Sequence, residues 1–503
     1  MTNSPKDYAT RMSPTPSLRR ILLTFLLLGS VLRCAQSQSE DSALPSYPEF
    51  PLSEVEASLA DYQRKELTTR RFKQEDLAPI LAQLPSTFQV DTAGQSVQGR
   101  PLWRVVWGEG DIEVLLWSQM HGDEPTATAA LFDLFSWMEG SDDGLDSLRS
   151  LLRSELHLTF LPMLNPDGAE VYERRNALGI DLNRDAVHLT SPEAQLLKGE
   201  RDRLNADWGF NLHDQSTYYS VGFPAERGAV LSILAPAFDW DKTMSPKRED
   251  AAQLIALMND IWQQHVPGQV GRYNDDFEPR AFGDNLQKWG TRTVLIESGG
   301  YAGDPEKQEI RRLNVLGLIA GLHGIATGRY EQFFLEDYER IPRNESNGMH
   351  DVILQDAQVE IDGGSYVMDI GIRKSERTLP PRNRTYTVSA YVSDLGDLST
   401  FGAFDRLALD GARVEPGKVY PGEHSLTAVS RLDPRELYRA GYTAVRLSEA
   451  LAGPPPTDEL RLLSPNNRLS DTVTYGAALD LLVYDTDGNL THAVVNGNLI
   501  NLD

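Results

Sequence analysis

An imidazole and a carboxylate stand three residues apart in Trp117-Ser-Gln-Met-His-Gly-Asp-Glu-Pro125, a polar run that follows an apolar one. His121 and Glu124 at such a corner can converge on one divalent ion. A mixed nitrogen and oxygen donor set suits borderline Zn²⁺, whereas Mg²⁺ and Ca²⁺ prefer shells made only of oxygen. The pair alone is weak evidence, because the chain holds 9 histidines and a glutamate near a helix start is favourable in any case.

Two further polar residues stand where predicted strands end. His213 closes the short strand expected over 208–214, and Glu297 follows the β-rich run that begins at 291, just before a glycine pair. His213 is the third candidate metal ligand, although a histidine by itself could equally be a core residue that bonds a backbone carbonyl. An unpaired buried carboxylate is costly, so Glu297 on a buried strand calls for a functional reason.

Buried strands and amphipathic helices must position these side chains. The runs 113–118 and 157–164 are nearly continuous in apolar residues, as strands covered on both faces require. Apolar residues at helical spacing predict helices over 126–138, 192–206 and 313–326. Strands that alternate with helices, with polar residues at their C-terminal ends, predict an α/β sheet whose site lies at that edge.

From about residue 351 onward, the sequence consists mainly of short β-rich runs separated by turns. Among them are 366–372, 385–392 and 481–484. This pattern predicts a C-terminal β-sandwich of about 150 residues. The expected division is a signal peptide (1–38), an N-terminal lead-in (39–75), a catalytic domain (76–330), a linker (331–350) and the β-sandwich (351–503).

The acidic composition bears on partners but does not identify a substrate. The chain has 503 residues, a formal net charge of -25 and a pI of about 4.8. Nucleic-acid binding needs clustered Lys and Arg that neutralise phosphates, so this balance argues against a nucleic-acid partner.

A basic pair followed by a short apolar run is typical of an export signal. Arg19-Arg20 precede the apolar run 21–32, which is shorter than the ~20 residues of a membrane-spanning helix. We therefore expect export to the periplasm or the extracellular space, with cleavage near 35–38 and no transmembrane segment in the mature chain. Cys34 stands where a lipoprotein would carry its acylated residue, but Arg33 before it disfavours lipid anchoring.

Six short motifs occur in an order that resembles the zinc metallocarboxypeptidases (the carboxypeptidase A-like peptidases), in particular a bacterial branch with a C-terminal β-domain. They are His121-Gly-Asp-Glu124, Asn165-Pro-Asp-Gly168, Arg174-Arg-Asn176, Asp181-Leu-Asn-Arg184, Asn211-Leu-His213 and Ile296-Glu-Ser298. The likeness runs from about Gly99 to Gly324. Such an ordered set is far more specific than any single motif. The fold that it implies is a mixed central sheet flanked by helices.

The resemblance also implies a role for each motif residue. The ligands of one Zn²⁺ per chain would be His121, Glu124 and His213, with the fourth position left for water. Glu297 would be the general base, and Arg174 would stabilise the oxyanion. Asn183 and Arg184 would hold the terminal carboxylate of the substrate. Arg175 is an alternative to its neighbour, but the spacing to the following Asn residues favours Arg174.

Two features of the family have no clear counterpart. Its digestive animal members use a mobile tyrosine on the terminal carboxylate; Tyr273 is near the expected place, while Asp275 and Asp276 are closer by count. Asp284 lies in the segment expected to form the side-chain pocket. It could select a basic or diaminopimelate-like side chain, or could equally accept a local hydrogen bond.

The sequence therefore predicts an exported zinc-dependent carboxypeptidase that acts on a peptide or peptide-like substrate. An amidase or deacylase of the same fold, acting on cell-wall peptides or N-acyl amino acids, is the nearest alternative. A non-catalytic binding protein is an alternative of another class. Against it, an inert relative would be expected to lose a ligand or the base, and all four of these residues are present. The oligomeric state is not predicted.

Overall fold

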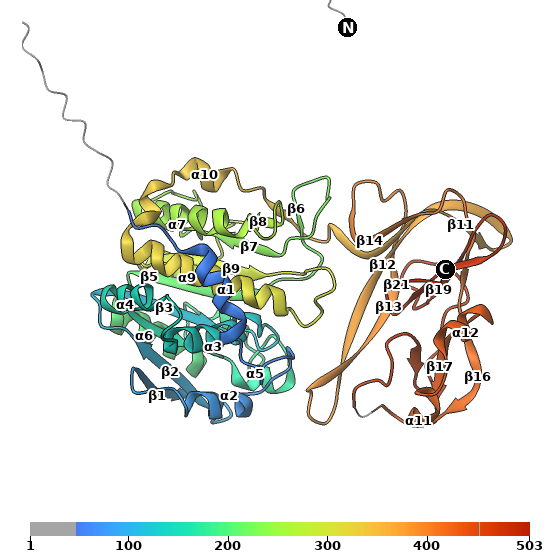
Figure 1. Cartoon of the computed structure of the whole chain (residues 1–503), viewed down its shortest axis with the longest axis horizontal. Helices are drawn as coiled ribbons and strands as arrows, with labels where there is room; N and C mark the ends of the chain where they lie inside the picture. Colours follow the sequence, from blue (N-terminus) through green and yellow to red (C-terminus); the bar gives the residue numbers. More distant parts are fainter. Residues whose placement is uncertain (1–46, 452, 503) are drawn as a thin grey trace, which may run out of the picture. The chain divides into compact units, whose positions relative to one another are not determined.

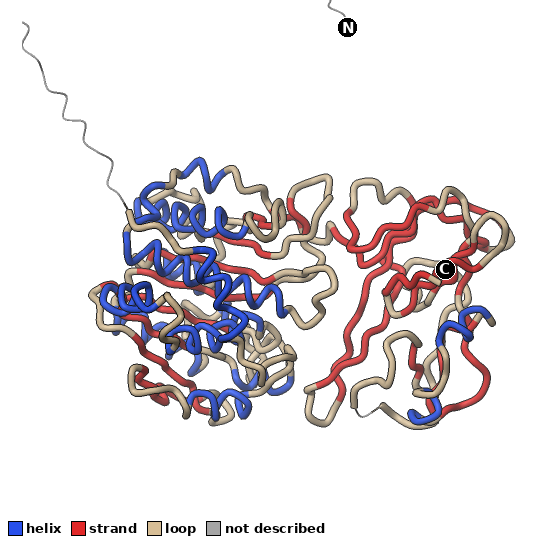
Figure 2. The backbone as a smooth tube through the Cα atoms, viewed as in Figure 1, coloured by secondary structure: helices blue, strands red, loops and turns tan. Residues whose placement is uncertain are grey.

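The computed structural model describes residues 47–451 and 453–502. The expected signal peptide, including Cys34, lies outside these residues. Helices and strands alternate up to residue 339, and strands dominate after it (Figure 2). We call residues 52–339 the α/β region and residues 349–501 the C-terminal β region. In the described residues, no helix combines the length and apolar character that a membrane span requires.

An eight-stranded mixed sheet forms the centre of the α/β region, in the order β1-β2-β4-β3-β5-β9-β7-β8 (Figure 1). The four central strands, β4, β3, β5 and β9, run parallel, and antiparallel neighbours continue the sheet on both sides. Its strands are β1 (Phe88–Gln95), β2 (Pro101–Trp107), β3 (Ile112–Ser118), β4 (Leu156–Leu161), β5 (Trp208–Asp214), β7 (Leu231–Leu234), β8 (Val270–Arg272) and β9 (Arg292–Ser298). The expected α/β class and mixed sheet are confirmed.

Helices cover both faces of this sheet. The helices of the region are α1 (Leu52–Tyr62), α2 (Gln74–Leu81), α3 (Thr126–Glu139), α4 (Asp146–Glu155), α5 (Pro166–Val171), η1 (Leu182–Arg184), α6 (Pro192–Leu204), α7 (Pro246–Trp262), α8 (Phe282–Lys288), α9 (Gln308–Thr327), η2 (Arg329–Gln332) and α10 (Leu335–Glu339). The helices predicted over 126–138, 192–206 and 313–326 correspond to α3, α6 and α9.

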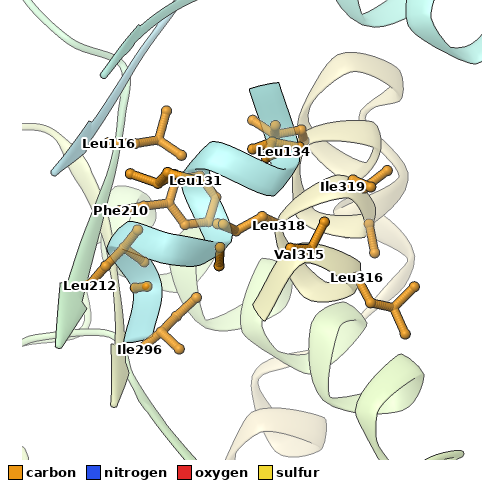
Figure 3. Close-up of a cluster of buried hydrophobic side chains, with 14 of the residues drawn as sticks. Leu116, Leu131, Leu134, Phe210, Leu212, Ile296, Val315, Leu316, Leu318 and Ile319 are labelled. Carbon is orange, nitrogen blue, oxygen red and sulfur yellow. The ribbon is translucent and has the colours of Figure 1, made fainter. Parts of the chain in front are cut away.

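Successive side chains of the central strands point to opposite faces of the sheet, and both faces are buried. This explains why the sequences of these strands are almost wholly apolar. Leu116 and Phe210 pack with Leu131 of α3 and Val315 of α9 on one face (Figure 3). On the other face, neighbouring strand residues such as Leu115 join a second cluster with the residues of α6 and α8. Because both faces are buried, each strand needs apolar side chains at successive positions. The charged side chains and the histidines of these strands therefore lie at or next to the strand ends.

The N-terminal segment belongs to this core. Val55 and Leu59 of α1 are buried in the main cluster of the α/β region. Helix α2 begins at Gln74 and contains Pro79. The division expected at residue 75 falls inside α2.

Three sheets form the C-terminal β region. The first has the order β13-β12-β11-β14, the second β15-β19-β20-β21 and the third β16-β17-β18. Its strands are β11 (Met349–Ile361), β12 (Gly364–Leu379), β13 (Thr385–Gly396), β14 (Gly402–Ala408), β15 (Val414–Pro416), β16 (Lys418–His424), β17 (Tyr442–Leu447), β18 (Arg461–Leu463), β19 (Leu481–Tyr484), β20 (Leu490–Val495) and β21 (Asn498–Asn501). Ahead of them, the short strand β10 (Asn344–Glu345) pairs with β6 (Ser220–Val221).

Two apolar clusters hold these sheets together. The first sheet packs on the second through residues such as Val352 and Val483, which is the sandwich expected from the sequence. The other face of the second sheet, with Leu482, packs on the third sheet and on α12 (Pro434–Arg439). The parallel third sheet, together with α11 (Leu426–Val429) and α12, is an addition that the β-rich runs do not predict.

Candidate metal centre

Three side chains converge at the C-terminal edge of the central strands. The potential ligand atoms of His121, Glu124 and His213 all lie within 4.8 Å of one another, and all three residues are buried. Nδ1 of His121 lies 2.7 Å from one Glu124 carboxylate oxygen, and Nδ1 of His213 lies 2.7 Å from the other. The two imidazole nitrogens are 3.2 Å apart. The structure thus brings together the three residues expected to be ligands.

Glycine allows the turn that carries His121 and Glu124 to lie against a second turn. A Cβ atom added at Gly122 would stand 2.0 Å from the carbonyl carbon of Gly168. Asn165, which opens the second turn, caps α5 by accepting a hydrogen bond from the Gly168 backbone N–H at 2.9 Å. The motifs at 121–124 and 165–168 therefore depend on each other sterically.

Asp181 fixes the orientation of the His121 ring. Its Oδ1 lies 3.1 Å from His121 Nε2, and a carboxylate can only accept, so Nε2 carries the hydrogen. A neutral His121 then directs the Nδ1 lone pair at the Glu124 carboxylate, which is also an acceptor. Such a contact needs a donor or a cation beside it, and Nη1 of Arg174 lies 3.0 Å from His121 Nδ1 and 3.1 Å from the Glu124 oxygen.

The charges at this edge shift the pKa values of the ligands. Burial lowers the pKa of His121, but Glu124 and Asp181 outweigh it and raise the value to about 9. Burial raises the pKa of Glu124, but the two histidines hold it below its usual range. The raised pKa of His121 favours its protonated form when no metal is bound. A divalent ion would replace that proton, because imidazole binds metals in its neutral form.

The donor set fits zinc. With Zn–N distances of ~2.1 Å, two nitrogen ligands at a tetrahedral angle lie about 3.4 Å apart, close to the separation of the two Nδ1 atoms. Two imidazoles and one carboxylate are also the donors that a catalytic zinc site commonly uses. The three residues would leave a further position open.

Glu297 lies beside this cluster on the neighbouring strand. His213 of β5 and Glu297 of β9 are opposite each other in the parallel register. The Glu297 side chain is buried, at 8% exposure, and no hydrogen bond to it is present within the described residues. Burial and the nearby Glu124 carboxylate raise the pKa of Glu297 well above its usual value. A carboxylate held in this way is suited to accept and release a proton.

Of the two adjacent arginines, the structure directs Arg174 to the cluster. Its Nη1 lies 3.0 Å from His121 Nδ1 and 3.1 Å from a Glu124 oxygen, and its Nε donates to Asp181 at 3.0 Å. Arg175 instead donates to the carbonyl oxygen of Gly179. Arg174 thus presents a fixed positive charge beside the ligands, whereas Arg175 stabilises a loop.

Asn183 and Arg184 do not contact the ligands. The Asn183 side chain accepts a hydrogen bond from the Phe282 backbone N–H at 2.8 Å, at the start of α8. Nε of Arg184 lies 3.2 Å from the Glu278 carboxylate. They join the site indirectly, because the backbone N–H of Asn183 donates to Asp181, which orients His121. A substrate carboxylate at Arg184 would have to compete with Glu278.

The three candidates for the position of the family's mobile tyrosine have different surroundings in the structure. Tyr273 packs against Tyr219, and burial together with the nearby Glu297 charge raises the pKa of its hydroxyl. Asp275 pairs with Lys242 and Arg248. Asp276 also pairs with Lys242. Only the tyrosine therefore lies near the proposed base.

Asp284 has an observed local role. It accepts a hydrogen bond from the Glu278 backbone N–H at 3.0 Å, and burial raises the pKa of its carboxyl to about 7. Asp284 thereby holds the loop that carries the partner of Arg184. This contact is the local acceptor role expected as one of two possibilities; selection of a basic side chain stays untested.

Two supporting residues have no predicted role in the sequence. Asp181 contacts both His121 and Arg174, and its place two residues before Asn183 within one motif is the signal that could have identified it. Lys307 is buried beside the cluster, where it pairs with Asp214 at 3.1 Å and donates to the Ser298 carbonyl oxygen at 3.0 Å. No local sequence pattern distinguishes Lys307 from a surface lysine.

Comparisons with known proteins agree with this arrangement. The model of the zinc carboxypeptidase family matches residues 75–208. This segment includes His121, Glu124 and Arg174, and ends before His213 and Glu297, which the sheet brings to the same edge. Carboxypeptidase SOL1 of Arabidopsis thaliana is 37% identical over 98 residues, which are 18% of this chain and 20% of that protein. The chain thus spans about a fifth of the length of that relative.

Solved structures of metallo-carboxypeptidases are also similar. The enzyme from Burkholderia cenocepacia is 19% identical, with 51% of this chain and 70% of that chain covered and a TM-score of 0.41. The enzyme from Pseudomonas aeruginosa was solved in complex with (2-guanidinoethylmercapto)succinic acid. It is 18% identical, with 52% of this chain and 70% of that chain covered and a TM-score of 0.41.

Zinc, expected from the sequence resemblance, is confirmed as the cofactor of the matching family and suits the donors present. The match to the zinc carboxypeptidase family thus covers the segment 75–208, which carries two of the three residues of the donor cluster.

Proposed function

We propose that this protein is a zinc-dependent metallocarboxypeptidase that hydrolyses the C-terminal bond of peptides. The observation that carries this proposal is the Glu297 carboxylate, which is buried without a hydrogen-bond partner among the described residues and lies on the strand beside His213. Zn²⁺, when bound, polarises the scissile carbonyl and lowers the pKa of a water at its open position.

The residues around the ligands have separate roles in catalysis and in positioning. Glu297 accepts a proton from the attacking water and delivers it to the departing amine nitrogen. Arg174, already beside Glu124, stabilises the negative charge that develops on the carbonyl oxygen. Asp181 holds His121 and Arg174 at the same time and so fixes their separation.

Recognition of the terminal carboxylate falls to Asn183 and Arg184 in this proposal. A guanidinium can bind a carboxylate through two parallel hydrogen bonds. Arg184 is 37% exposed, so the group is accessible, and a substrate carboxylate would displace Glu278 from it.

The ion pair between Arg184 and Glu278 also supports a second candidate function. If Glu278 keeps Arg184 neutralised, nothing selects a free terminal carboxylate, and the ligands with Glu297 would hydrolyse an internal or acyl amide. The chain would then be an amidase or deacylase of the same fold.

Hydrolysis of a mixed library of short peptides, with and without a chelator, tests the proposal. We expect release of single C-terminal residues that stops when zinc is removed and returns when zinc is restored. C-terminally amidated peptides separate the two candidates: a carboxypeptidase leaves them intact, whereas an amidase or deacylase cleaves them as readily as free acids.

A matched pair of substitutions ties the activity to the site. Glu297→Gln should abolish trimming while zinc content, measured by metal analysis, stays at one per chain. Glu113→Gln places the same change near the opposite end of β3, where the carboxylate contacts His157, and should leave trimming unchanged. Zinc-loaded protein that trims no peptide and cleaves no amide would contradict both candidates.

We also propose that the protein is exported. The support is the basic pair Arg19-Arg20 followed by the apolar run 21–32. N-terminal sequencing of the mature protein from the periplasm or medium should begin near 36–39. Recovery of the uncleaved chain from the cytoplasm would contradict export, and a lipid on Cys34 would show anchoring instead of release.

A further inference from the structure

A cavity of about 1000 Å³ opens beside the ligand cluster. Its lining includes Glu124, the neighbouring Asp123, Asp214 and Tyr218. Neither Asn183 nor Arg184 lines it. The cavity therefore begins at the metal centre and extends away from the residues assigned to the terminal carboxylate.

The C-terminal β region supplies the opposite wall. Lys374 and Glu376 of β12 line the cavity together with Thr387 and Val388 of β13. Asp405 of β14 lines it farther along. Side chains separated from the ligands by well over a hundred residues of sequence thus belong to the same cavity.

Specific contacts hold this wall in place. The Tyr218 hydroxyl donates to Asp351 at 2.6 Å, between the α/β region and β11. Arg70 and Arg71, both largely buried, bind the two carboxylate oxygens of Glu376 at 2.6 and 3.0 Å. Because each arginine binds a different oxygen of Glu376 and both arginines are largely buried, the position of this carboxylate is better defined than in an exposed ion pair. The wall is therefore fixed to the α/β region rather than loosely adjacent to it.

The charge of the lining favours cations. Each basic residue of the lining already has an acidic partner: Arg70 pairs with Glu376, Lys307 with Asp214, and Lys374 with Asp351. Four further carboxylates of the lining, Asp123, Asp304, Asp405 and Asp458, have no ion pair within the described residues. The cavity thus carries an excess of negative charge that would attract an ammonium or guanidinium group.

We propose that this cavity binds the part of a peptide substrate that precedes the scissile bond, with the C-terminal β region in direct contact with it. This inference rests on the proposed function. If the C-terminal residue and its carboxylate point toward Arg184, the preceding residues must leave the metal on the other side, where the cavity lies. Its volume is at the upper end of the roughly 300–1000 Å³ of ligand pockets, enough for a short peptide. The preferred substrates are short peptides with a positive charge toward their N-terminus.

A substitution that fills the cavity from the C-terminal wall tests the contact. Val388→Trp introduces a large side chain on the lining, and Ser389→Trp places the same group on the next residue of β13, which is exposed and does not line the cavity. We expect Val388→Trp to lower kcat/KM for penta- and hexapeptides at least tenfold, with N-blocked dipeptides unaffected. Ser389→Trp should leave every length unchanged.

Binding measurements keep this test independent of catalysis. Glu297→Gln with zinc bound, alone and combined with Val388→Trp, can be titrated calorimetrically with hexapeptides and dipeptides. Weaker binding of only the hexapeptide in the double variant supports the contact even if no peptide is trimmed, in which case the proposed function alone fails. Equal binding of both peptide lengths by both proteins overturns the contact.

A charge substitution tests the preferred substrate class. Asp405→Asn combined with Asp458→Asn removes the two carboxylates without an ion pair that the C-terminal β region contributes to the lining. We expect kcat/KM for peptides with an N-terminal Lys to fall several-fold and that for matched Glu peptides to stay or rise. An identical change for both peptides overturns the preference for cations.

Discussion

Each region of the molecule buries a carboxylate, but only one of these two carboxylates has a cationic partner within the described residues. In the C-terminal β region, Asp480 is 1% exposed and binds the buried Arg461 through two nitrogens, at 2.8 and 3.0 Å. In the α/β region, Glu297 is 8% exposed and no described residue donates a hydrogen bond to it. Burial of a carboxylate with a matching cation serves the structure, because the charge is compensated. Burial beside other negative charges costs stability and is typical of a functional group.

The largest effect is expected from Glu297→Gln. Removing a general base typically lowers the rate 10²- to 10⁴-fold, so kcat for peptide trimming should fall by about that factor. The unfolding temperature should not fall, because no hydrogen bond within the described residues is lost. Steady-state kinetics measures the loss of kcat, and a thermal scan measures the unfolding temperature. A clear loss of stability with little loss of activity would place Glu297 with Asp480 as a structural group.

The reverse outcome is expected for Asp480→Asn. Removing one partner of a buried ion pair typically costs about 3–5 kcal/mol, because Arg461 is left buried without its counter-ion. Urea unfolding should show this loss. The kcat of the protein that remains folded should be unchanged for dipeptides, whose residues do not reach the C-terminal wall. A comparable loss after Asp480→Asn combined with Arg461→Met would contradict the uncompensated charge as the cause.

Two adjacent arginines of the α/β region, Arg174 and Arg175, allow a functional and a structural side chain to be compared directly. Arg174→Ala should lower kcat about 10²- to 10³-fold, as the loss of one oxyanion donor typically does. Arg175→Ala should change kcat less than twofold, because its observed contact is with the Gly179 carbonyl oxygen in an exposed loop. Kinetics of the two variants with one peptide are sufficient. Similar losses in both would contradict the assignment of Arg174.

The smallest effect concerns pH and the C-terminal β region. His350 is 1% exposed, and burial lowers its pKa from 6.5 to about 4. As the pH falls below about 6.5, the unfolded chain takes up a proton that the folded chain refuses, so stability is lost down to about pH 4. The loss is about 3 kcal/mol at most. Urea unfolding at pH 7 and 4.5 should show it, and His350→Gln should reduce it; an unchanged pH dependence in the variant would exclude His350 as its source.

Local patterns were sufficient for the ligands and for the strands that carry them. His121 and Glu124 lie in one short motif, and the apolar central strands carry their charged side chains and histidines at or next to the strand ends. The choice of Arg174 over Arg175 also agrees with the structure, because their spacing to Asn176 and Asn183 differs by one residue. By contrast, the interaction of Arg184 with Glu278 joins residues nearly a hundred positions apart and has no local signal.

The amino-acid sequence by itself determined the α/β class, the candidate ligands and base, and the β-rich C-terminal region, because periodicity and motif spacing are local properties. Only the tertiary structure decided that Asp181 orients His121, that Lys307 compensates Asp214, and that Val388 shares a cavity with Glu124. It also decided that a third sheet packs on the sandwich. These features depend on distances between segments far apart in the chain, which the packing of the sheets sets and no short pattern encodes.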